Sequence, residues 1–366
     1  LLYQKPSGEW IMAYTTIDKP SDYFNTVLYT GTENSNTISV GFEPDFTWIK
    51  RRNSARDHQL FNSTTGANTV LSSNLTSAEE GTGAGGWTPN SDGFVVHQHV
   101  KTNSNGDTYV GWNWKAETSF TNDASSTSVG SIDSTGSVNT DAGFSIITFT
   151  GNNTNDATIA HGLGTTPAMI ITKNREDVVN WRVWHKNLPN ATDVLFLNGT
   201  NAAVATSAHA NGYIKTVGSA TYSTHASNSD ANGVNGDDDD MIAYCFAEKQ
   251  GYSKIGSYTG NGNADGSFVY TGFKPAWIIF KRLATNDWFI VDNKIHDFNK
   301  AESASKMLRP NLDNAEQANN TVDLLSNGFK ARNANDAYNA SGSTYIYMAF
   351  AEQPFVTSTG VPATAR

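Results

Sequence analysis

The chain has 366 residues, of which 38% are hydrophobic and 11% aromatic, so it can bury the cores of two or three domains. Only 16% of the residues are charged, and the formal net charge is −10. An acidic chain with few cations binds phosphates poorly, so we expect neither nucleic acid nor an anionic membrane surface as a partner. No apolar run approaches the roughly 18 residues of a membrane helix, so we expect no membrane insertion.

The polar residues are mainly Asn, Ser, Thr and Gly, which favour turns and strands over helices. The composition therefore predicts an all-β protein. Cys245 is the single cysteine, so neither a disulfide framework within the chain nor a cysteine-cluster zinc site is expected. The chain begins LLYQKPSG, without a methionine or a signal peptide, and is interpreted as a processed product or part of a longer polypeptide.

One short pattern recurs three times: Tyr or Phe followed by Thr-Gly, then a proline, then a lysine six residues after that proline. An apolar stretch separates the proline from the lysine, and it reads FTWI, AMIIT and AWIIF in turn. The repeat-defining residues are Gly31, Pro44, Trp48 and Lys50, then Gly151, Pro167 and Lys173, and finally Gly260, Pro275, Trp277 and Lys281. Repetition of this kind indicates a shared fold, with structural roles for the repeated residues.

Each repeat closes on an aromatic-rich segment: TYVGWNWKAE at 108–117, MIAYCFAE at 241–248 and TYIYMAFAE at 344–352. The last of these alternates between two faces, as a strand does. Short strands separated by Gly, Asn and Asp turns predict antiparallel β-sandwiches. One helix is expected, over 298–308 (FNKAESASKML).

These patterns divide the chain into six segments. They are a lead-in segment (1–24), a first β-sandwich repeat (25–117), a Ser/Thr/Gly-rich linker (118–142), a second repeat (143–250), a third repeat (251–355) and a flexible tail (356–366). The predicted fold is therefore three tandem β-sandwiches. The single linker predicts that the first repeat hinges, while the second and third sit close together.

Two clusters are candidate metal ligands. His97 and His99 lie on one face of a predicted strand, although no third ligand is apparent nearby. Oxygen ligands suited to calcium gather in SDANGVNGDDDD, where the candidates are Asp230, Asn232, Asp237, Asp238, Asp239 and Asp240. Calcium is the one cofactor that the sequence suggests. The alternative interpretation of this stretch is an acidic turn that leads into the closing strand.

Aromatic side chains among polar loops are the candidate binding residues, because sugar recognition combines aromatic stacking with amide and carboxylate hydrogen bonds. The four candidates are Trp87, Trp181, Trp184 and Trp288, with burial in a sandwich core as the alternative. Glu117, Glu248 and Glu352 end the three closing segments and are interpreted as structural acceptors. No nucleophile elbow, phosphate loop or zinc-protease motif is present, so we expect no enzyme.

The repeated motifs resemble a known family. GFEPDFTWIKRR, SDGFVV and GDTYVGWNWKAE in the first repeat, and GFKPAWIIFKR, SNGF and SGSTYIYMAFAE in the third, are similar to a repeated domain of marine bacteriophage virion proteins of the tail-fibre type. The second repeat departs from this pattern, because GLGTTPAMIITKNR lacks the tryptophan and DDDDM replaces Gly-x-Thr-Tyr. The resemblance implies a concanavalin-like, SPRY-like or jelly-roll sandwich.

The resemblance also implies a function. We expect a structural protein of the virion surface, a tail-fibre or receptor-binding component that attaches to a host glycan or envelope protein. Its other partners would be virion proteins and copies of itself, with a trimer favoured. The alternatives are a capsid decoration or other structural virion protein without a ligand, and an enzyme that degrades surface polysaccharide.

Overall fold

The computed structural model describes residues 2–4, 10–82, 86–190, 192–203, 212–225, 233–295, 306–318 and 322–363, with side chains from residue 13 onward. The protein is all-β, and every strand pair between its named strands is antiparallel. Within the described ranges, the helical elements are η1 (Pro20–Asp22) and α1 (Ala124–Thr127). None of the described helices is long and apolar enough to cross a membrane.

The first part of the chain, called unit 1 (residues 24–117), forms two sheets. The four-stranded sheet has the order β3 (Phe24–Thr30), β11 (Thr108–Trp114), β5 (Phe46–Arg51), β6 (Gln59–Asn62). The three-stranded sheet has the order β4 (Asn36–Ser39), β10 (Gly93–Val96), β9 (Trp87–Asn90). The short strands β7 (Thr69–Val70) and β8 (Glu80–Gly81) pair beside them.

Unit 2 (residues 118–248) has a larger sheet of seven strands. Their order is β12 (Thr118–Asn122), β13 (Ser134–Asn139), β14 (Phe144–Thr150), β21 (Asp240–Phe246), β16 (Met169–Asn174), β17 (Arg182–His185), β18 (Leu195–Phe196). The smaller sheet is β15 (Thr158–Ala160), β20 (Thr221–His225), β19 (Tyr213–Val217).

The expected linker at 118–142 is therefore wrong. This segment contributes β12 and β13, and β13 pairs along β14 from Thr135 opposite Thr148 to Asn139 opposite Phe144. Its Ser/Thr/Gly composition resembles a linker because an edge hairpin covers a strand mainly through its backbone and leaves one face in water.

Unit 3 (residues 252–354) repeats the arrangement of unit 1. Its four-stranded sheet is β22 (Ser253–Thr259), β30 (Thr344–Pro354), β24 (Phe273–Arg282), β25 (Trp288–Asp292), and its three-stranded sheet is β23 (Phe268–Tyr270), β29 (Gly328–Ala331), β28 (Val322–Leu325). Two further pairs are β26 (Lys306–Met307) with β27 (Gln317–Ala318) and, near the N-terminus, β1 (Leu2–Gln4) with β2 (Trp10–Met12).

A helix is expected over 298–308, but the structure has no helix at residues 306–308, which are the described part of this range. Residues 298–305 lie outside the described part of the chain, but Lys306 and Met307 form β26, and Leu308 bridges to Ile290 in antiparallel fashion. The described part of the expected tail, residues 356–363, folds back, because Val356 pairs with Pro362 and the backbone N–H of Ser358 donates to Asp18.

Each unit has its own apolar core between its two sheets, which is a β-sandwich-like arrangement. In unit 1, for example, Ile38 and Phe94 of the small sheet pack with Ile49, Phe61 and Tyr109 of the large sheet. Separate clusters fill the same place in unit 2 and in unit 3. These cores use only one face of each large sheet.

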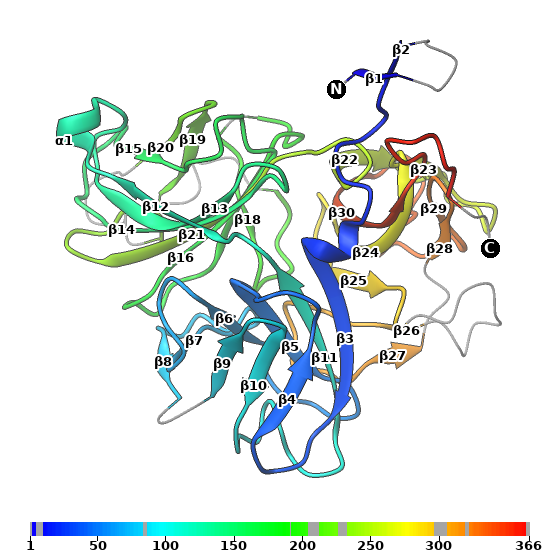
Figure 1. Cartoon of the computed structure of the whole chain (residues 1–366), viewed down its shortest axis with the longest axis horizontal. Coiled ribbons are helices and arrows are strands. Elements are labelled where there is room, and N and C mark those ends of the chain that lie inside the picture. Colours follow the sequence, from blue (N-terminus) through cyan, green and yellow to red (C-terminus); the bar gives the residue numbers. More distant parts are fainter. Residues whose placement is uncertain are drawn as a thin grey trace.

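The other face of each large sheet meets a single central core that all three units share. Figure 1 shows the three units arranged around this common centre. Trp114, Phe246 and Phe350 occupy equivalent positions on β11, β21 and β30, and each ring contacts the other two at centroid distances of 6.4, 5.7 and 6.1 Å. The cavity that Trp114 and Phe246 help to line is only about 10 Å³, roughly the smallest space that can hold one water. Because unit 1 packs into this core, the hinge expected for the first repeat is also wrong.

Candidate functional site

The repeated glycines hold a turn that only glycine can form. A Cβ atom on Gly31, Gly151 or Gly260 would lie 2.1, 2.0 or 2.3 Å from a backbone carbonyl oxygen of a neighbouring loop. That loop also carries a buried asparagine in each unit, whose side-chain oxygen accepts the backbone N–H of the residue after the glycine. These bonds are Thr32 to Asn103, Asn152 to Asn235 and Asn261 to Asn339, at 2.9 to 3.0 Å.

The repeated lysines Lys50, Lys173 and Lys281 are fully buried. Each Nζ donates to the backbone carbonyl of the following residue, at 2.6, 2.6 and 2.5 Å. Burial lowers their pKa values to about 8, 8 and 7. We infer that these side chains close the turn after β5, β16 and β24, because a buried ammonium needs carbonyl partners.

The candidate sugar-binding tryptophans do not form a surface site. Trp87, Trp181 and Trp288 are at most 1% exposed, and Trp184 is half-buried against the core of unit 2. Trp87 stacks on Phe61 at 5.9 Å inside unit 1. Three of the four rings therefore cannot stack on a sugar, so the expectation is wrong for Trp87, Trp181 and Trp288.

Instead, Trp181 and Trp288 join one unit to the next, together with His58 at the equivalent position of unit 1. The three contacts are Trp181 Nε1 to the Ser72 carbonyl (3.0 Å), Trp288 Nε1 to the Phe196 carbonyl (2.8 Å) and His58 Nε2 to the Arg309 carbonyl (3.0 Å). His58 Nδ1 accepts from Trp48 Nε1 at 2.8 Å, which assigns the proton of this ring to Nε2. Unit 2 thus donates to unit 1, unit 3 to unit 2 and unit 1 to unit 3.

Backbone hydrogen bonds follow the same cyclic order. They run from the N–H of Glu79 to the Arg175 carbonyl (2.6 Å), from Ala203 to Leu283 (2.7 Å) and from Glu316 to Arg52 (2.8 Å). Two of them are reinforced by ion pairs, of Arg175 with Glu79 at 2.6 Å and of Arg52 with Glu316 at 2.8 Å. The same kinds of contact therefore recur in cyclic order at the three interfaces, and the three units close a ring.

One further interface position carries a different buried polar residue in each unit: Asn62, His185 and Asp292. Trp112 Nε1 donates to Asp292 Oδ2 at 2.8 Å, and burial raises the pKa of this carboxyl. His185 Nε2 lies 3.3 Å from the Tyr347 carbonyl, and burial lowers the pKa of the ring to about 4.

The described part of the calcium candidate is an acidic turn. Asp237 and Asp238 are exposed, Asp239 accepts from Asn174 Nδ2 at 2.7 Å, and Asp240 pairs with Arg175 at 3.2 Å. Burial, with nearby carboxylates, raises the pKa of Asp239. The other two candidate ligands, Asp230 and Asn232, lie outside the described residues.

Among the residues that the structure describes, no group of three or more His, Cys, Asp or Glu side chains could hold a metal ion. His97 instead contacts Ser35, with its Nδ1 3.1 Å from the hydroxyl oxygen. The pKa of His99 is lowered by burial and by the nearby Lys101.

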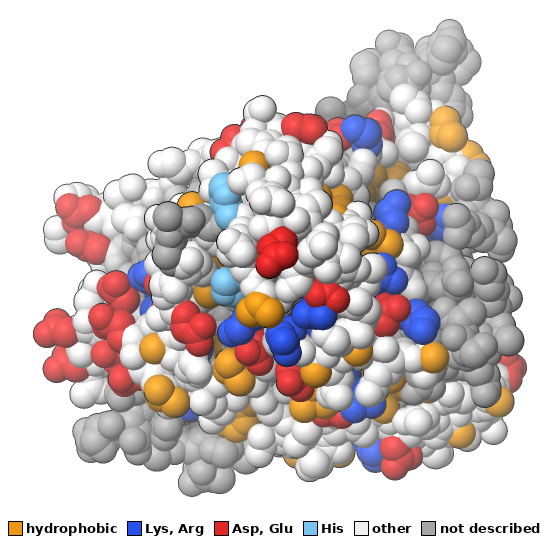
Figure 2. Space-filling model, turned by 90° about the horizontal axis from the view of Figure 1, so that it is seen from below, with side chains coloured by type: hydrophobic (Ala, Val, Ile, Leu, Met, Phe, Trp, Pro, Cys, Tyr) orange, Lys and Arg blue, Asp and Glu red, His pale blue; other side chains and the backbone are white. Residues whose placement is uncertain are grey.

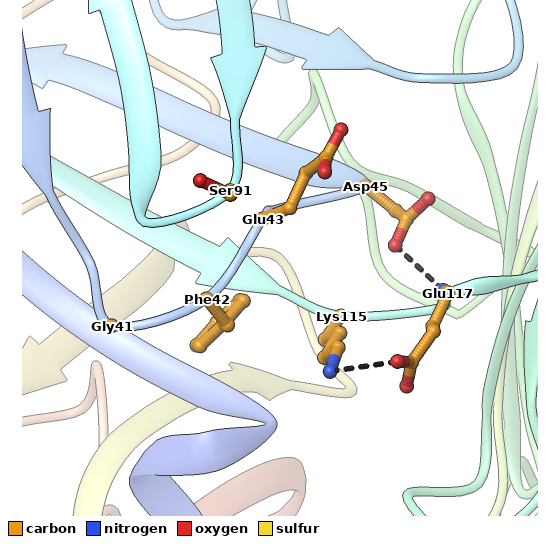
Figure 3. Close-up of a pocket in the computed structure, with 7 residues that line it drawn as sticks. All are labelled: Gly41, Phe42, Glu43, Asp45, Ser91, Lys115 and Glu117. Atoms are coloured by element: carbon orange, nitrogen blue, oxygen red, sulfur yellow. Dashed lines mark hydrogen bonds and ion pairs between the residues drawn. The ribbon is translucent and has the colours of Figure 1, made fainter.

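A cavity of about 450 Å³ opens at the connection between units 1 and 2 (Figure 3). Its lining residues are Gly41, Phe42, Glu43, Asp45, Ser91, Lys115 and Glu117. Asp45 Oδ2 accepts the backbone N–H of both Ala116 and Glu117 at 2.7 Å, and Lys115 pairs with Glu117 at 3.0 Å. The carboxylate of Asp45 thus holds the turn between β11 and β12.

A second cavity, of about 400 Å³, lies at the connection between units 2 and 3. It is lined by Tyr14, Glu248, Gln250, Gly251, Ser253, Lys254, Tyr270, Thr271 and Gly272. It combines two tyrosine side chains with charged, hydroxyl and amide groups that can hydrogen-bond a polar ligand. None of these residues except Glu248 stood out in the sequence, because they come from three segments that only the fold brings together.

The face of the molecule that is seen from below in Figure 2 is polar and mixed in charge. Figure 2 shows Lys and Arg side chains interspersed with Asp and Glu on one face, with hydrophobic side chains scattered in small groups. Ion pairs between the described residues include Arg51 with Asp107 (2.5 Å) and Lys101 with Asp57 (3.1 Å).

Residues 19–354 match the family model described as a domain of unknown function (DUF7483). Because the match covers most of the chain, the protein belongs to this family. Comparisons with curated protein sequences and with solved structures gave no match.

Proposed function

We propose that this protein is a structural component of a bacteriophage virion, built from three tandem copies of one β-sandwich, and that it serves host attachment as a tail-fibre or receptor-binding part. Its partners would be other virion proteins, further copies of the chain, and a glycan or envelope protein on the host surface. The proposal combines the resemblance of the repeated motifs with the architecture of the ring.

The closed ring of three units is the observation that carries this proposal. Three interfaces, each with a buried side-chain hydrogen bond to a backbone carbonyl, fix the units relative to one another. The shared aromatic core leaves almost no internal space. Such a body is stiff because it cannot open one interface without exposing the common core. Stiffness suits a protein that presents binding loops at a particle surface.

The purely structural alternative, a capsid decoration or other virion protein without a ligand, is favoured by one observation. Burial of Trp87, Trp181 and Trp288 removes the aromatic residues that best suited a sugar site in the sequence. We propose no catalytic role for the cavity in Figure 3, because Asp45 uses one oxygen for two backbone N–H groups and the other for the Ser63 hydroxyl at 2.7 Å.

The test is binding of the purified chain, displayed on beads, to a panel of marine bacterial strains and to their surface polysaccharides. Attachment predicts saturable binding that free protein competes away, with no oligosaccharide released. Absence of binding to every strain and polysaccharide would reject attachment in favour of the structural role. Released oligosaccharides would instead indicate an enzyme. A parallel series with a calcium chelator tests whether the acidic turn takes part.

A further inference from the structure

Unit 3 carries two exposed aromatic side chains on the outer strand of its small sheet. Phe268 is 49% exposed and Tyr270 is 54% exposed, and both flank the buried Val269 on β23. Val269 pairs with Phe329 of the neighbouring strand, just as Ile38 pairs with Phe94 in unit 1 and Ile159 with Tyr222 in unit 2. At the positions equivalent to the two aromatics, unit 1 has Thr37 and Ser39, and unit 2 has Thr158 and Ala160.

The exposure of these rings follows from the alternation of side chains along β23 and from the residue that faces Tyr270 on the neighbouring strand. Phe268 and Tyr270 are two residues apart, so they point to the same face about 6.6 Å from each other along the strand. The residue opposite Tyr270 is Gly328, which has no side chain to cover the ring. Addition of a Cβ at Gly328 would place it 3.2 Å from the ring of Phe268. The two rings therefore form an apolar platform on this face of the sheet, where Leu325, opposite Gly328, is a third, partly buried apolar residue.

The cavity between units 2 and 3 begins at Tyr270. The hydroxyl of Tyr14 lies 3.4 Å from that of Tyr270 and donates to the Gly272 carbonyl at 2.7 Å. Gly272 permits this approach because its φ is +81° and because a Cβ there would lie 2.6 Å from the Tyr14 oxygen. Tyr14 also packs edge-to-face against Phe355 at 6.3 Å. The tyrosine pair is thus fixed before any ligand arrives.

Charged and amide groups also line this cavity. Glu248 pairs with Lys254 at 3.0 Å and with Lys186, and it accepts the backbone N–H of Ile255 at 3.1 Å. Burial alone would raise the pKa of Glu248, but the hydrogen bonds from the two lysines lower it below its usual value. Lys254 and the exposed Gln250 can donate to a ligand, while the ionised carboxylate can accept from a hydroxyl group.

We propose that the Phe268–Tyr270 platform and this cavity form a binding site for a neutral, hexopyranose-containing glycan. The apolar face of a pyranose ring would lie on the aromatic rings, and its hydroxyl groups would meet Glu248, Lys254 and Gln250. A neutral sugar fits because the carboxylate is already paired with cations. The site rests on the proposed attachment function and locates it at the connection between units 2 and 3.

The test is saturation-transfer NMR and calorimetric titration with neutral hexasaccharides of glucose, galactose and mannose. The test variant carries both Phe268→Ala and Tyr270→Ala. Leu28→Ala is the matched control, because Leu28 is a 41% exposed apolar residue on a strand of unit 1. We expect the wild type and the control to bind at least one hexasaccharide, with ring protons receiving most saturation. The double variant should lose affinity by about tenfold or more while it melts at the wild-type temperature.

Two results would overturn this site. One is that no hexasaccharide binds the wild type, and the other is that the double variant binds as tightly as the control. The bead assay on bacterial cells separates this failure from failure of the attachment function. Cells that bind the wild type and the double variant equally would leave attachment intact and place it elsewhere, for example on a protein receptor. Cells that bind neither would reject both proposals.

Discussion

Acid should weaken this protein through His185, which sits at the interface between units 2 and 3. Its side chain is 1% exposed, Nδ1 accepts the backbone N–H of Asn187 at 3.1 Å, and Nε2 lies 3.3 Å from the Tyr347 carbonyl. Both contacts suit the neutral ring with the proton on Nε2. Protonation would place a cation in this interface without a carboxylate hydrogen bond to it among the described residues.

The size of the effect follows from the pKa. Burial lowers the pKa of His185 from 6.5 to about 4 in the folded protein. Between these values the unfolded chain binds the proton and the folded chain does not, so stability present above pH 6.5 is lost as the pH falls towards 4. A difference of 2.5 pKa units corresponds to about 3 kcal/mol of unfolding free energy. That is a large part of the roughly 5–15 kcal/mol typical of a folded protein.

The assay is urea unfolding of the wild type and of His185→Asn across this pH range. Asparagine is the matched replacement because Asn62 occupies the equivalent buried position in unit 1. Other buried histidines, such as His58 and His161, titrate in both proteins, so the difference between the two curves isolates His185. The wild type should lose about 3 kcal/mol more than the variant on going from neutral to acid pH. Equal losses in the two proteins would refute the reasoning.

Two further substitutions test the ring and its turns. Trp181→Phe removes the hydrogen-bond donor to the Ser72 carbonyl, which lies 3.0 Å from Nε1. The free energy of unfolding in urea should fall by about 1–3 kcal/mol, because that carbonyl then stays buried and unpaired. A loss within experimental error would mean that this hydrogen bond does not stabilise the interface. Gly260→Ala places a Cβ 2.3 Å from the Ala340 carbonyl and should lower stability by about 3 kcal/mol, whereas Gly81→Ala, with nothing within 4 Å, should change it by less than about 0.5 kcal/mol. Similar effects of the two glycine substitutions would contradict the steric account of the repeated turn.

The sequence predicted the strands and the repeated turns because their signals are local. Gly260 must be glycine whatever lies outside its own unit, and Lys281 reaches a carbonyl only one residue away. The polar hairpin at 118–142 was missed because composition does not distinguish an edge strand from a linker. The hairpin pairs with β14, which lies close in the chain, but no periodic hydrophobic pattern predicts this pairing.

The ring could not be predicted, although the sequence contained a sign of it. The stretch AWIIF is apolar at every position, which is typical of a strand covered on both faces. One face of this strand packs into the core of unit 3, and only the fold shows that the other face meets units 1 and 2. Trp181 and Trp288 looked like surface residues for the same reason, since their partners are carbonyls of another unit. The cavity at Tyr270 also depends on segments far apart in the chain.

The central claim is that three units close around one shared core and therefore form a single cooperative body. Scanning calorimetry of the full chain at neutral pH tests this most directly. The account predicts one transition, with a ratio of calorimetric to van't Hoff enthalpy of about one. Separate transitions for the units, or a ratio of about three in a single broad peak, would contradict it, because three independent sandwiches would melt on their own.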